Sequence, residues 1–164
     1  MAAADLTAER LREILHYDPE TGIFTWRVRT SRCVKIGSEC SHRGSIGYVV
    51  IQILSTPYSA HRLAWLHVTG SWPIGVIDHI NGVRDDNRFC NLRDVSNTEN
   101  LQNRRRPNKN TSSGFLGVHR VADAWVAQIG VNGRNTHIGI FKTPELAHAA
   151  YIEAKKNLHQ TCTV

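Results

Sequence analysis

The sequence predicts an α+β protein built in two parts. Strand-like alternation of apolar residues and helix-capping signals occur in both halves of the chain. Between the halves, a run of arginines, a proline and small polar residues begins at RRRP and cannot build a core. We therefore expect a first domain at 1–103, a basic linker at 104–113 and a second domain at 114–164.

The composition is that of a folded, water-soluble protein. With 164 residues, 41% of them hydrophobic and 21% charged, the chain can form one ordinary domain or two small ones. No apolar stretch approaches the length of a membrane span, and the N-terminus MAAADLTAERLREIL has no apolar signal core. We expect a cytoplasmic location and no membrane partner.

The four cysteines form no CxxC pair, so reduced thiols are expected in a cytoplasmic protein. Cys33, Cys40 and His42 are residues of the kind that bind zinc. A fourth ligand is missing, and the sequence therefore gives a zinc site little support.

The net charge of +6 lies entirely in the rear of the chain. Residues 1–100 contain eleven basic and eleven acidic residues, whereas residues 101–164 contain nine basic residues and three acidic ones. A neutral front and a basic rear favour two tasks, with the rear facing a polyanion. A basic surface that only keeps the protein soluble explains the same charge.

The front part is expected to begin with a helix capped by Asp5, followed by a turn at 18–22 and a strand over 24–28. A second strand is expected at 47–54 and a helix at 60–69. Apolar residues of the two helices are expected in the core: Leu11, Ile14, Leu15, Leu63, Trp65 and Leu66.

The rear part predicts three strands, at 115–120, 124–131 and 135–141, and the dipeptide NG predicts a hairpin between the last two. A final helix is expected from Thr143, with one apolar side made of Leu146, Ala150, Tyr151, Ala154 and Leu158. The small core is expected to contain Val118, Trp125, Ile129, Ile138, Phe141, Ala147 and Tyr151. This is a three-stranded antiparallel sheet packed on one helix.

The run IDHINGVRDDNRFCNLR, at 77–93, places a carboxylate beside an imidazole. Asp78 and His79 should end a short strand, with an antiparallel partner at 92–95. The capping-box pattern SNTE then starts a helix that packs across both strands, so that Asp78 and Asn100 converge. One carboxylate and one amide oxygen suit magnesium or manganese rather than zinc.

On the other side of the strand, His79 can take a proton from an attacking water if its imidazole is neutral, which a pKa near ~6.5 permits. Asn87 and Asn91 are expected to fix the loop that holds the imidazole. His61 and Arg62, in the preceding helix, fit either a contact with DNA or bracing of the neighbouring loop.

Taken in this order, these residues resemble the HNH endonuclease family, in the variant whose last position is asparagine. The motifs that resemble phage-type HNH homing endonucleases are HRLAW at 61–65, WP at 72–73, IDHING at 77–82, DNR at 86–88, NLR at 91–93 and ENLQN at 99–103. YDPETGIFTW at 17–26 and GYVVIQI at 47–53 fit the same group.

This resemblance implies a ββα-metal nuclease core at about 75–103. It implies that His79 is the general base, that Asn91 is the supporting catalytic asparagine, and that Asp78 and Asn100 are metal ligands. The implied cofactor is Mg²⁺ or Mn²⁺, with one ion per active site.

The rear part resembles the plant APETALA or ethylene-response-factor DNA-binding domain, on the segments SGFLGVHR, AW, NGRNTHIGIF and TPELAHAAY. The resemblance implies a sheet that lies in the DNA major groove. The residues expected to face DNA are His119, Arg120, Gln128, Arg134, Asn135 and His137, joined by Arg104, Arg105 and Arg106 of the linker. Val121 and Ala122 stand where arginine is usual, and His137 replaces a tryptophan, so the base preference does not carry over.

Together the two resemblances imply a metal-dependent DNA endonuclease, a homing enzyme encoded by a phage and acting on double-stranded DNA in a bacterial host. No obligate protein partner is visible. Two other classes stay open. A DNA-binding transcriptional regulator with an inactive nuclease half is disfavoured by the four intact site residues, and an RNA-binding module by the absence of an exposed aromatic pair.

Overall fold

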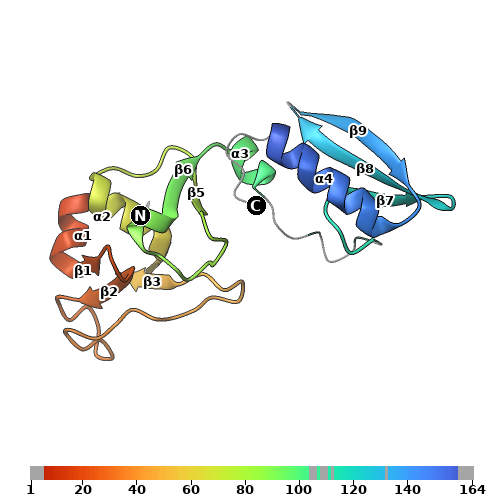
Figure 1. Cartoon of the computed structure of the whole chain (residues 1–164). Helices are drawn as coiled ribbons and strands as arrows, with labels where there is room; N and C mark the ends of the chain where they lie inside the picture. The colour runs from red at the N-terminus through yellow and green to blue at the C-terminus, as the bar shows by residue number, and fades with distance from the viewer. Residues whose placement is uncertain (1–5, 104–106, 108–110, 112, 132, 159–164) are drawn as a thin grey trace. The chain divides into compact units, whose positions relative to one another are not determined.

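A computed structural model describes residues 6–103, 107, 111, 113–131 and 133–158. The chain forms two compact units, Met1–Ser96 and Asn97–Val164. Both units mix helices and strands (Figure 1), so the predicted α+β class is confirmed. The expected linker at 104–113 lies largely outside the described residues. No helix in the described ranges is long and apolar enough to cross a membrane.

The first unit opens with helix α1, Ala8–Ile14, and an antiparallel hairpin of strands β1, Leu15–Asp18, and β2, Ile23–Trp26. The cap of α1 is Thr7, whose side chain accepts a hydrogen bond from the Arg10 amide. The predicted cap, Asp5, lies outside the described residues. The helix was expected to continue to the turn at 18–22. It ends at Ile14 instead, because strand β1 occupies Leu15–Asp18 before that turn.

A second hairpin joins strands β3, Val50–Ile53, and β4, Thr56–Ser59. One longer strand was predicted at 47–54, and β4 was not predicted. The turn between the strands is made by Leu54 and Ser55, both with positive φ (48° and 68°). Neither residue type favours that conformation, so the sequence carries no turn signal here.

Helix α2, Ala60–Thr69, follows directly and ends at Gly70 in the left-handed region (φ 81°). Strands β5, Val76–His79, and β6, Leu92–Val95, pair antiparallel, and the short 3₁₀ helix η1, Phe89–Asn91, precedes β6. Helix α2 and the two paired strands match the prediction for this segment, whereas η1 lies where a loop was expected.

The core of the first unit lies between α1, α2 and the two hairpins, and α1 packs against α2. Its fully buried large side chains are Phe24, Leu11, Ile14, Leu15, Ile51, Ile53, Leu63 and Leu66. Trp65 is partly buried and packs against this core. The predicted core residues are therefore confirmed, and the hairpin strands supply the rest.

The β1–β2 hairpin also supports the loop that connects β5 to β6. The Tyr17 hydroxyl donates to the Asn87 carbonyl oxygen at 2.7 Å, and the Phe89 amide donates to the Pro19 carbonyl oxygen at 3.1 Å. Gly22 lies directly against the peptide that joins Asn87 to Arg88. The loop is thus held by residues about 70 positions earlier in the chain.

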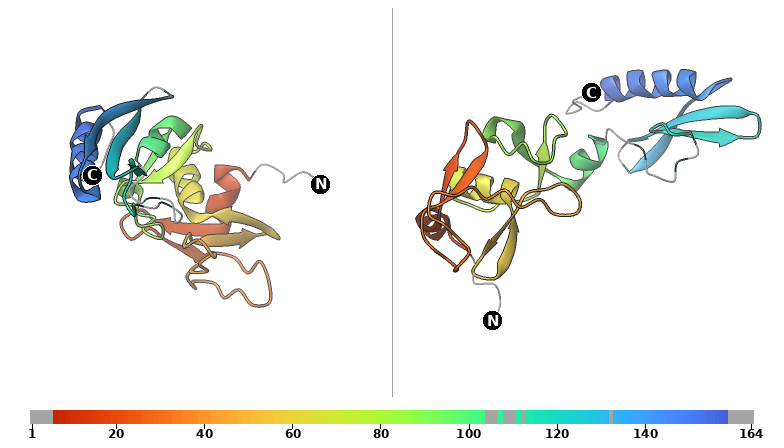
Figure 2. Two further views of the ribbon diagram at one scale, coloured as in Figure 1. Left: turned by 90° about the vertical axis from the view of Figure 1, so that its right-hand side faces the viewer. Right: turned by 90° about the horizontal axis from the view of Figure 1, so that it is seen from below.

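The second unit contains helix α3, Asn97–Gln102, and a three-stranded antiparallel sheet in the order β7–β8–β9. Its strands are Val118–Val121, Ala124–Val131 and Arg134–Phe141. Helix α4, Pro144–Leu158, packs along one face of the sheet (Figure 2). The predicted sheet and helix are confirmed, with the first strand starting at Val118 instead of 115.

The buried side of α4 differs from the prediction. Its buried residues are Ala147, Tyr151 and Lys155, spaced four apart, whereas Leu146 and Leu158 are exposed. Ala150 and Ala154 are intermediate in exposure. A pattern of apolar residue types favoured the neighbouring stripe of the helix, but the sheet is contacted by the stripe that includes a lysine.

The core of the second unit agrees with the prediction. Val118, Ile129, Ala147 and Tyr151 are buried, and Trp125, Ile138 and Phe141 pack against them. Gly117, at φ 69°, leaves room for the Tyr151 ring.

We expect Gly22→Ala to destabilise the first unit by about 2–5 kcal/mol. Positive φ costs a side chain about 1–2 kcal/mol, and the new Cβ would clash with main-chain atoms of Asn87 and Arg88, adding about 1–3 kcal/mol. Gly37→Ala is the matched control, because Gly37 also has positive φ but nothing within 4 Å of an added Cβ. Urea denaturation compares the two variants, and equal losses would contradict the proposed contact.

Candidate active site

Asp78 and His79 leave strand β5 on opposite sides. The strand alternates between partly buried and buried residues, and Ile77 and His79 are the buried ones. Successive side chains of a strand point to opposite faces. The carboxylate and the imidazole are therefore neighbours in sequence but face different surroundings, as the sequence analysis expected.

The Asp78 carboxylate is paired with an arginine. Arg93 stands directly opposite Asp78 in the β5–β6 register. Its Nε and Nη2 atoms both donate to Asp78 Oδ2, at 3.0 and 2.7 Å. Both side chains are partly buried, and the contact is a charge-assisted one. The sequence analysis assigned no role to Arg93.

The imidazole of His79 is buried and contacts an amide. His79 Nε2 lies 3.3 Å from Asn87 Oδ1, while Asn87 Nδ2 donates to the Asp85 carbonyl oxygen at 3.3 Å. Since the amide nitrogen is used elsewhere, the oxygen faces the ring, and this network assigns the proton to Nε2. The Nδ1 atom of neutral His79 then remains as the basic atom.

The protonation state of His79 follows from its burial. Burial lowers the pKa of His79 below its usual value of 6.5, and the contact with Asn87 and the nearby Asp78 carboxylate oppose that shift. The net direction is downward. At neutral pH the imidazole is therefore uncharged, which is the form that can accept a proton.

Asn91 fixes the loop rather than the imidazole. Its Oδ1 accepts from the Asn81 amide at 2.9 Å, and its Nδ2 donates to the Asp86 carbonyl oxygen at 2.8 Å. These bonds tie the start of the loop to its end. The amide that reaches His79 is that of Asn87, which the sequence analysis placed in a supporting role.

A charged pair closes the same loop. Asp86 accepts from Arg88 Nε and Nη2 at 2.8 and 2.6 Å, and from Asn81 Nδ2 at 2.6 Å. The hydrogen bonds from Arg88 lower the pKa of Asp86 to about 2. The carboxylate is therefore ionised at any physiological pH and keeps the loop closed.

Two aromatic neighbours of His79 were not predicted. The ring of His61, in α2, lies 5.2 Å from that of His79, and the ring of Tyr48 lies 5.8 Å from it. His61 is buried, which lowers its pKa to about 4, and its Nδ1 has no hydrogen-bond partner among the described residues. Of the two roles left open for His61, its position fits bracing of the site. Arg62 instead lies over the Trp72 ring at 5.6 Å.

The residues of the first unit fit a divalent metal only in part. Asp78 offers hard carboxylate oxygens of the kind that magnesium and manganese prefer, but Arg93 already neutralises it. No cluster of three metal-binding side chains occurs in the described ranges. Asn100, the second expected ligand, lies on α3 in the second unit. A cation would therefore need water and substrate oxygens.

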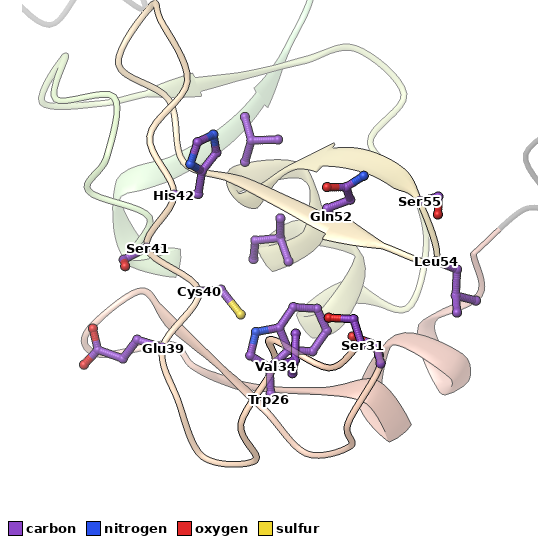
Figure 3. Close-up of a pocket in the computed structure, with 13 residues that line it drawn as sticks. Trp26, Ser31, Val34, Glu39, Cys40, Ser41, His42, Gln52, Leu54 and Ser55 are labelled. Atoms are coloured by element: carbon purple, nitrogen blue, oxygen red, sulfur yellow. The ribbon is translucent and has the colours of Figure 1, made fainter.

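An open cavity of about 900 Å³ lies elsewhere in the first unit, between the β1–β2 hairpin, the following loop and β3. The Cys40 thiol points into it beside Trp26, and Glu39 and His42 lie on its rim (Figure 3). Burial raises the pKa of Cys40 to about 12, so it is an unreactive thiol. Neither Asp78 nor His79 lines this cavity.

The zinc ligands considered in the sequence are not assembled. Cys33 is exposed and is absent from the cavity lining, and the described residues contain no metal-binding cluster.

In the second unit, the expected DNA-binding residues divide between the two faces of the sheet. His119 and Gln128 alternate with the core residues Val118, Ala127 and Ile129, so they face away from α4. Residues directly opposite each other share a face. His137 pairs with Gln128 and Asn135 with Gly130, so these two lie on the same open face.

The two arginines of the sheet lie on the other face. Arg120 pairs with Trp125, and its guanidinium lies over that ring at 6.0 Å. Arg134 pairs with Val131, which packs against the core. Both arginine side chains are exposed at the ends of their strands. Arg104, Arg105 and Arg106 lie outside the described residues.

Comparison with known protein families agrees with this geometry. Residues 58–102 match the model of the HNH endonuclease family. The matched segment runs from β4 through α2, β5 and β6 into α3, and it contains Asp78, His79, Asn91 and Asn100. An HNH endonuclease domain is therefore present, and it supports a nuclease as the class of protein.

The match covers less than half of the chain. Tyr17, Gly22 and Tyr48, which contact the site from outside, lie before it. The searches of curated proteins and of solved structures each returned no match.

We expect acid to destabilise the protein through His61. Its pKa is about 4 in the folded state and near 6.5 when unfolded, so between these values only the unfolded chain binds the proton. The free energy of unfolding then falls as pH falls, by up to about 1.4 kcal/mol per pH unit. His61→Leu removes this contribution. Between about pH 7 and about pH 5, the free energy of unfolding of the variant should therefore fall by about 2 kcal/mol less than that of the wild type.

Urea denaturation from about pH 7 to about pH 5, at constant ionic strength, measures the difference. Parallel stability profiles for wild type and His61→Leu would show that His61 is protonated equally in both states.

Proposed function

We propose that the chain is a divalent-metal-dependent HNH DNA endonuclease, a homing enzyme of phage type, whose rear unit binds the DNA that the front unit cuts. The observation that carries this proposal is the state of His79. A buried, neutral imidazole with its Nε2 directed at an amide oxygen leaves Nδ1 as the basic atom, next in sequence to the carboxylate residue Asp78.

In the proposed reaction, His79 Nδ1 takes a proton from a water molecule that attacks the scissile phosphorus. Asn87 holds the ring through Nε2 and stabilises the positive charge that develops there. Asn91 acts one step further away, because its two hydrogen bonds fix the loop that carries Asn87.

The expected cofactor is one Mg²⁺ or Mn²⁺ ion, held by Asp78 and Asn100 and completed by water and phosphate oxygens. When bound, such an ion offsets charge on the phosphate and on the leaving oxygen. Because Arg93 already pairs with Asp78, a cation must share that carboxylate with a guanidinium. We therefore expect weak metal binding by the free protein and tighter binding when DNA contributes oxygens.

A second function has one observation in its favour. The Asp78–Arg93 ion pair satisfies the carboxylate without any metal, as a DNA-binding regulator with an inactive nuclease half would require. Metal-dependent nicking of a supercoiled plasmid separates the two functions. A nuclease nicks with Mg²⁺ or Mn²⁺ and stops in chelator, whereas a regulator binds the plasmid and leaves it intact.

The proposal for the rear unit rests on charge and on an uncovered face. Nine of the basic residues and three of the acidic ones lie in residues 101–164. The sheet face away from α4 carries polar side chains able to contact base edges, namely His119, Gln128, Asn135 and His137. The exposed arginines at the strand ends then contact phosphates, which fix position rather than sequence.

We expect His79→Ala to lower the single-turnover cleavage rate by about 10²–10⁴ while DNA affinity stays nearly unchanged, since a general base contributes about that factor. Asn87→Ala should cost about 10–10² because the base loses its orientation. Gln52→Ala, at an exposed position on β3, serves as the control. Normal cutting by the His79 variant would remove the proposed base.

We expect the salt dependence of DNA binding to reside in the rear unit. Each phosphate contact contributes about 0.9 to the slope of log K against log[salt]. Replacing Arg120, Arg134, Lys142 and Lys156 by glutamine should therefore flatten the slope by about 2–4 units, while cleavage at saturating DNA persists. The control removes four charges from the first unit, at Arg10, Arg29, Arg32 and Lys35. If both quadruple variants flatten the slope equally, the rear unit has no special share in binding.

A further inference from the structure

Tyr48 belongs to a cluster of three rings around the proposed base. Its ring centroid lies 5.0 Å from that of His61 and 5.8 Å from that of His79, and the two imidazoles are 5.2 Å apart. His79 therefore has ring neighbours contributed by two separate segments. Tyr48 precedes the segment that matches the HNH family, so the match assigns it no role.

Tyr48 is carried by a short strap, residues 42–48, that bends sharply before it. The Gly44 amide donates to the Tyr48 carbonyl oxygen at 2.8 Å, and the Gly47 amide donates to the Gly44 carbonyl oxygen at 2.9 Å. Gly47 has φ 87°, which an L side chain rarely adopts. The strap thus turns back on itself and delivers the ring to the active site.

Two arginines, Arg84 and Arg43, connect the strap to the loop between β5 and β6. Arg84 donates from Nη1 to the Ile46 carbonyl oxygen at 2.7 Å, and its guanidinium lies 5.2 Å from the Tyr48 ring centroid. Arg43 forms an ion pair with Asp85 at 2.5 Å. The strap is therefore joined to the same loop that carries Asn87.

The hydrogen bond between His79 and Asn87 does not fix the imidazole by itself. At 3.3 Å it is longer than the usual 2.9–3.0 Å of an N–H···O bond. Rotation about χ2 of a histidine is broad, so this long hydrogen bond leaves the plane of the imidazole free to turn away from Asn87. A second constraint is needed to keep Nε2 toward Asn87.

On the basis of the nuclease function proposed above, we propose that Tyr48 is a positioning residue for His79. Its ring, held by Arg84, confines the imidazole against His61 in the plane where Nε2 meets Asn87 and Nδ1 stays available. Tyr48 is only half-buried and is not part of the buried core. Packing of the core alone does not account for an arginine-held ring at this position.

The first test observes the ring directly in the full-length chain, independently of cleavage. Nitrogen-15 NMR of the imidazoles should show His79 largely as the Nε2–H tautomer in the wild type, and a mixture of tautomers in Tyr48→Leu. Tyr48→Phe keeps the ring and should restore the wild-type spectrum. Tyr58→Leu is the control, because the ring of Tyr58 stacks on that of Trp72 at 5.9 Å.

The second test uses chemistry. Tyr48→Leu should lower the single-turnover rate at saturating DNA by about 10–10², the cost of a small misplacement of a reacting group, with DNA affinity unchanged. Tyr48→Phe should recover most of the lost rate, and Tyr58→Leu should cut normally. In His79→Gly, added imidazole should restore part of the activity, and this rescue should be lost when Tyr48→Leu is also present.

The role of Arg84 is tested by a double-mutant cycle. If Arg84 acts by holding Tyr48, Arg84→Gln lowers the rate in the wild-type background and has little further effect beside Tyr48→Leu. Additive losses would mean that Arg84 acts independently of Tyr48, for example on DNA. They would contradict the proposal that Arg84 acts by holding the Tyr48 ring.

The outcomes separate this inference from the nuclease proposal. A wild-type protein that cuts no DNA with Mg²⁺ or Mn²⁺ refutes the nuclease, and the NMR comparison still decides whether Tyr48 orients His79. A wild-type protein that cuts, together with Tyr48→Leu that cuts equally fast and shows an unchanged imidazole spectrum, overturns the positioning role. If Tyr58→Leu lowers the cleavage rate as much as Tyr48→Leu does, the loss reflects general destabilisation. That result would also overturn the positioning role of Tyr48.

Discussion

The first unit depends on one constraint, the burial of an uncharged imidazole at the end of a four-residue strand. His79 is 6% exposed, and burial lowers its pKa, so the ring stays neutral at neutral pH. A buried polar ring also needs partners. Asn87 supplies the polar one, and His61 and Tyr48 supply the rings around it.

The remainder of the unit positions these partners. Tyr17 and Gly22 hold the Asn87 backbone from the first hairpin, Asn91 ties the loop ends together, and Arg84 holds the strap. These contacts come from segments before and within the region that matches the HNH family. The β5–β6 pair is too short to be stable alone, so the nuclease motif needs the preceding hairpins and helices to hold its shape.

Local signals predicted much of this from the sequence. The strand at Val76–His79, its partner at Leu92–Val95, the helix ended by Gly70 and the rear sheet all follow from alternation, caps and turn residues. The β4 strand was missed because its turn uses Leu54 and Ser55 at positive φ. The direct contact of Asn87 with His79, the pairing of Arg93 with Asp78 and the ring contacts of Tyr48 were not predicted, because they arise from contacts across the fold that no local pattern encodes.

The electrostatics of the site explain why a second unit is useful. Asp78 is compensated by Arg93, Asp86 by Arg88, Asp85 by Arg43, and His79 is uncharged. Internal pairing of this kind leaves the centre with little charge to attract a polyanion. Residues 1–100 as a whole carry no net charge, and the +6 of the chain lies after them. In the function proposed above, residues outside the centre supply the attraction for DNA, and their charge does not perturb the proposed base. Affinity and proton transfer can then be set separately.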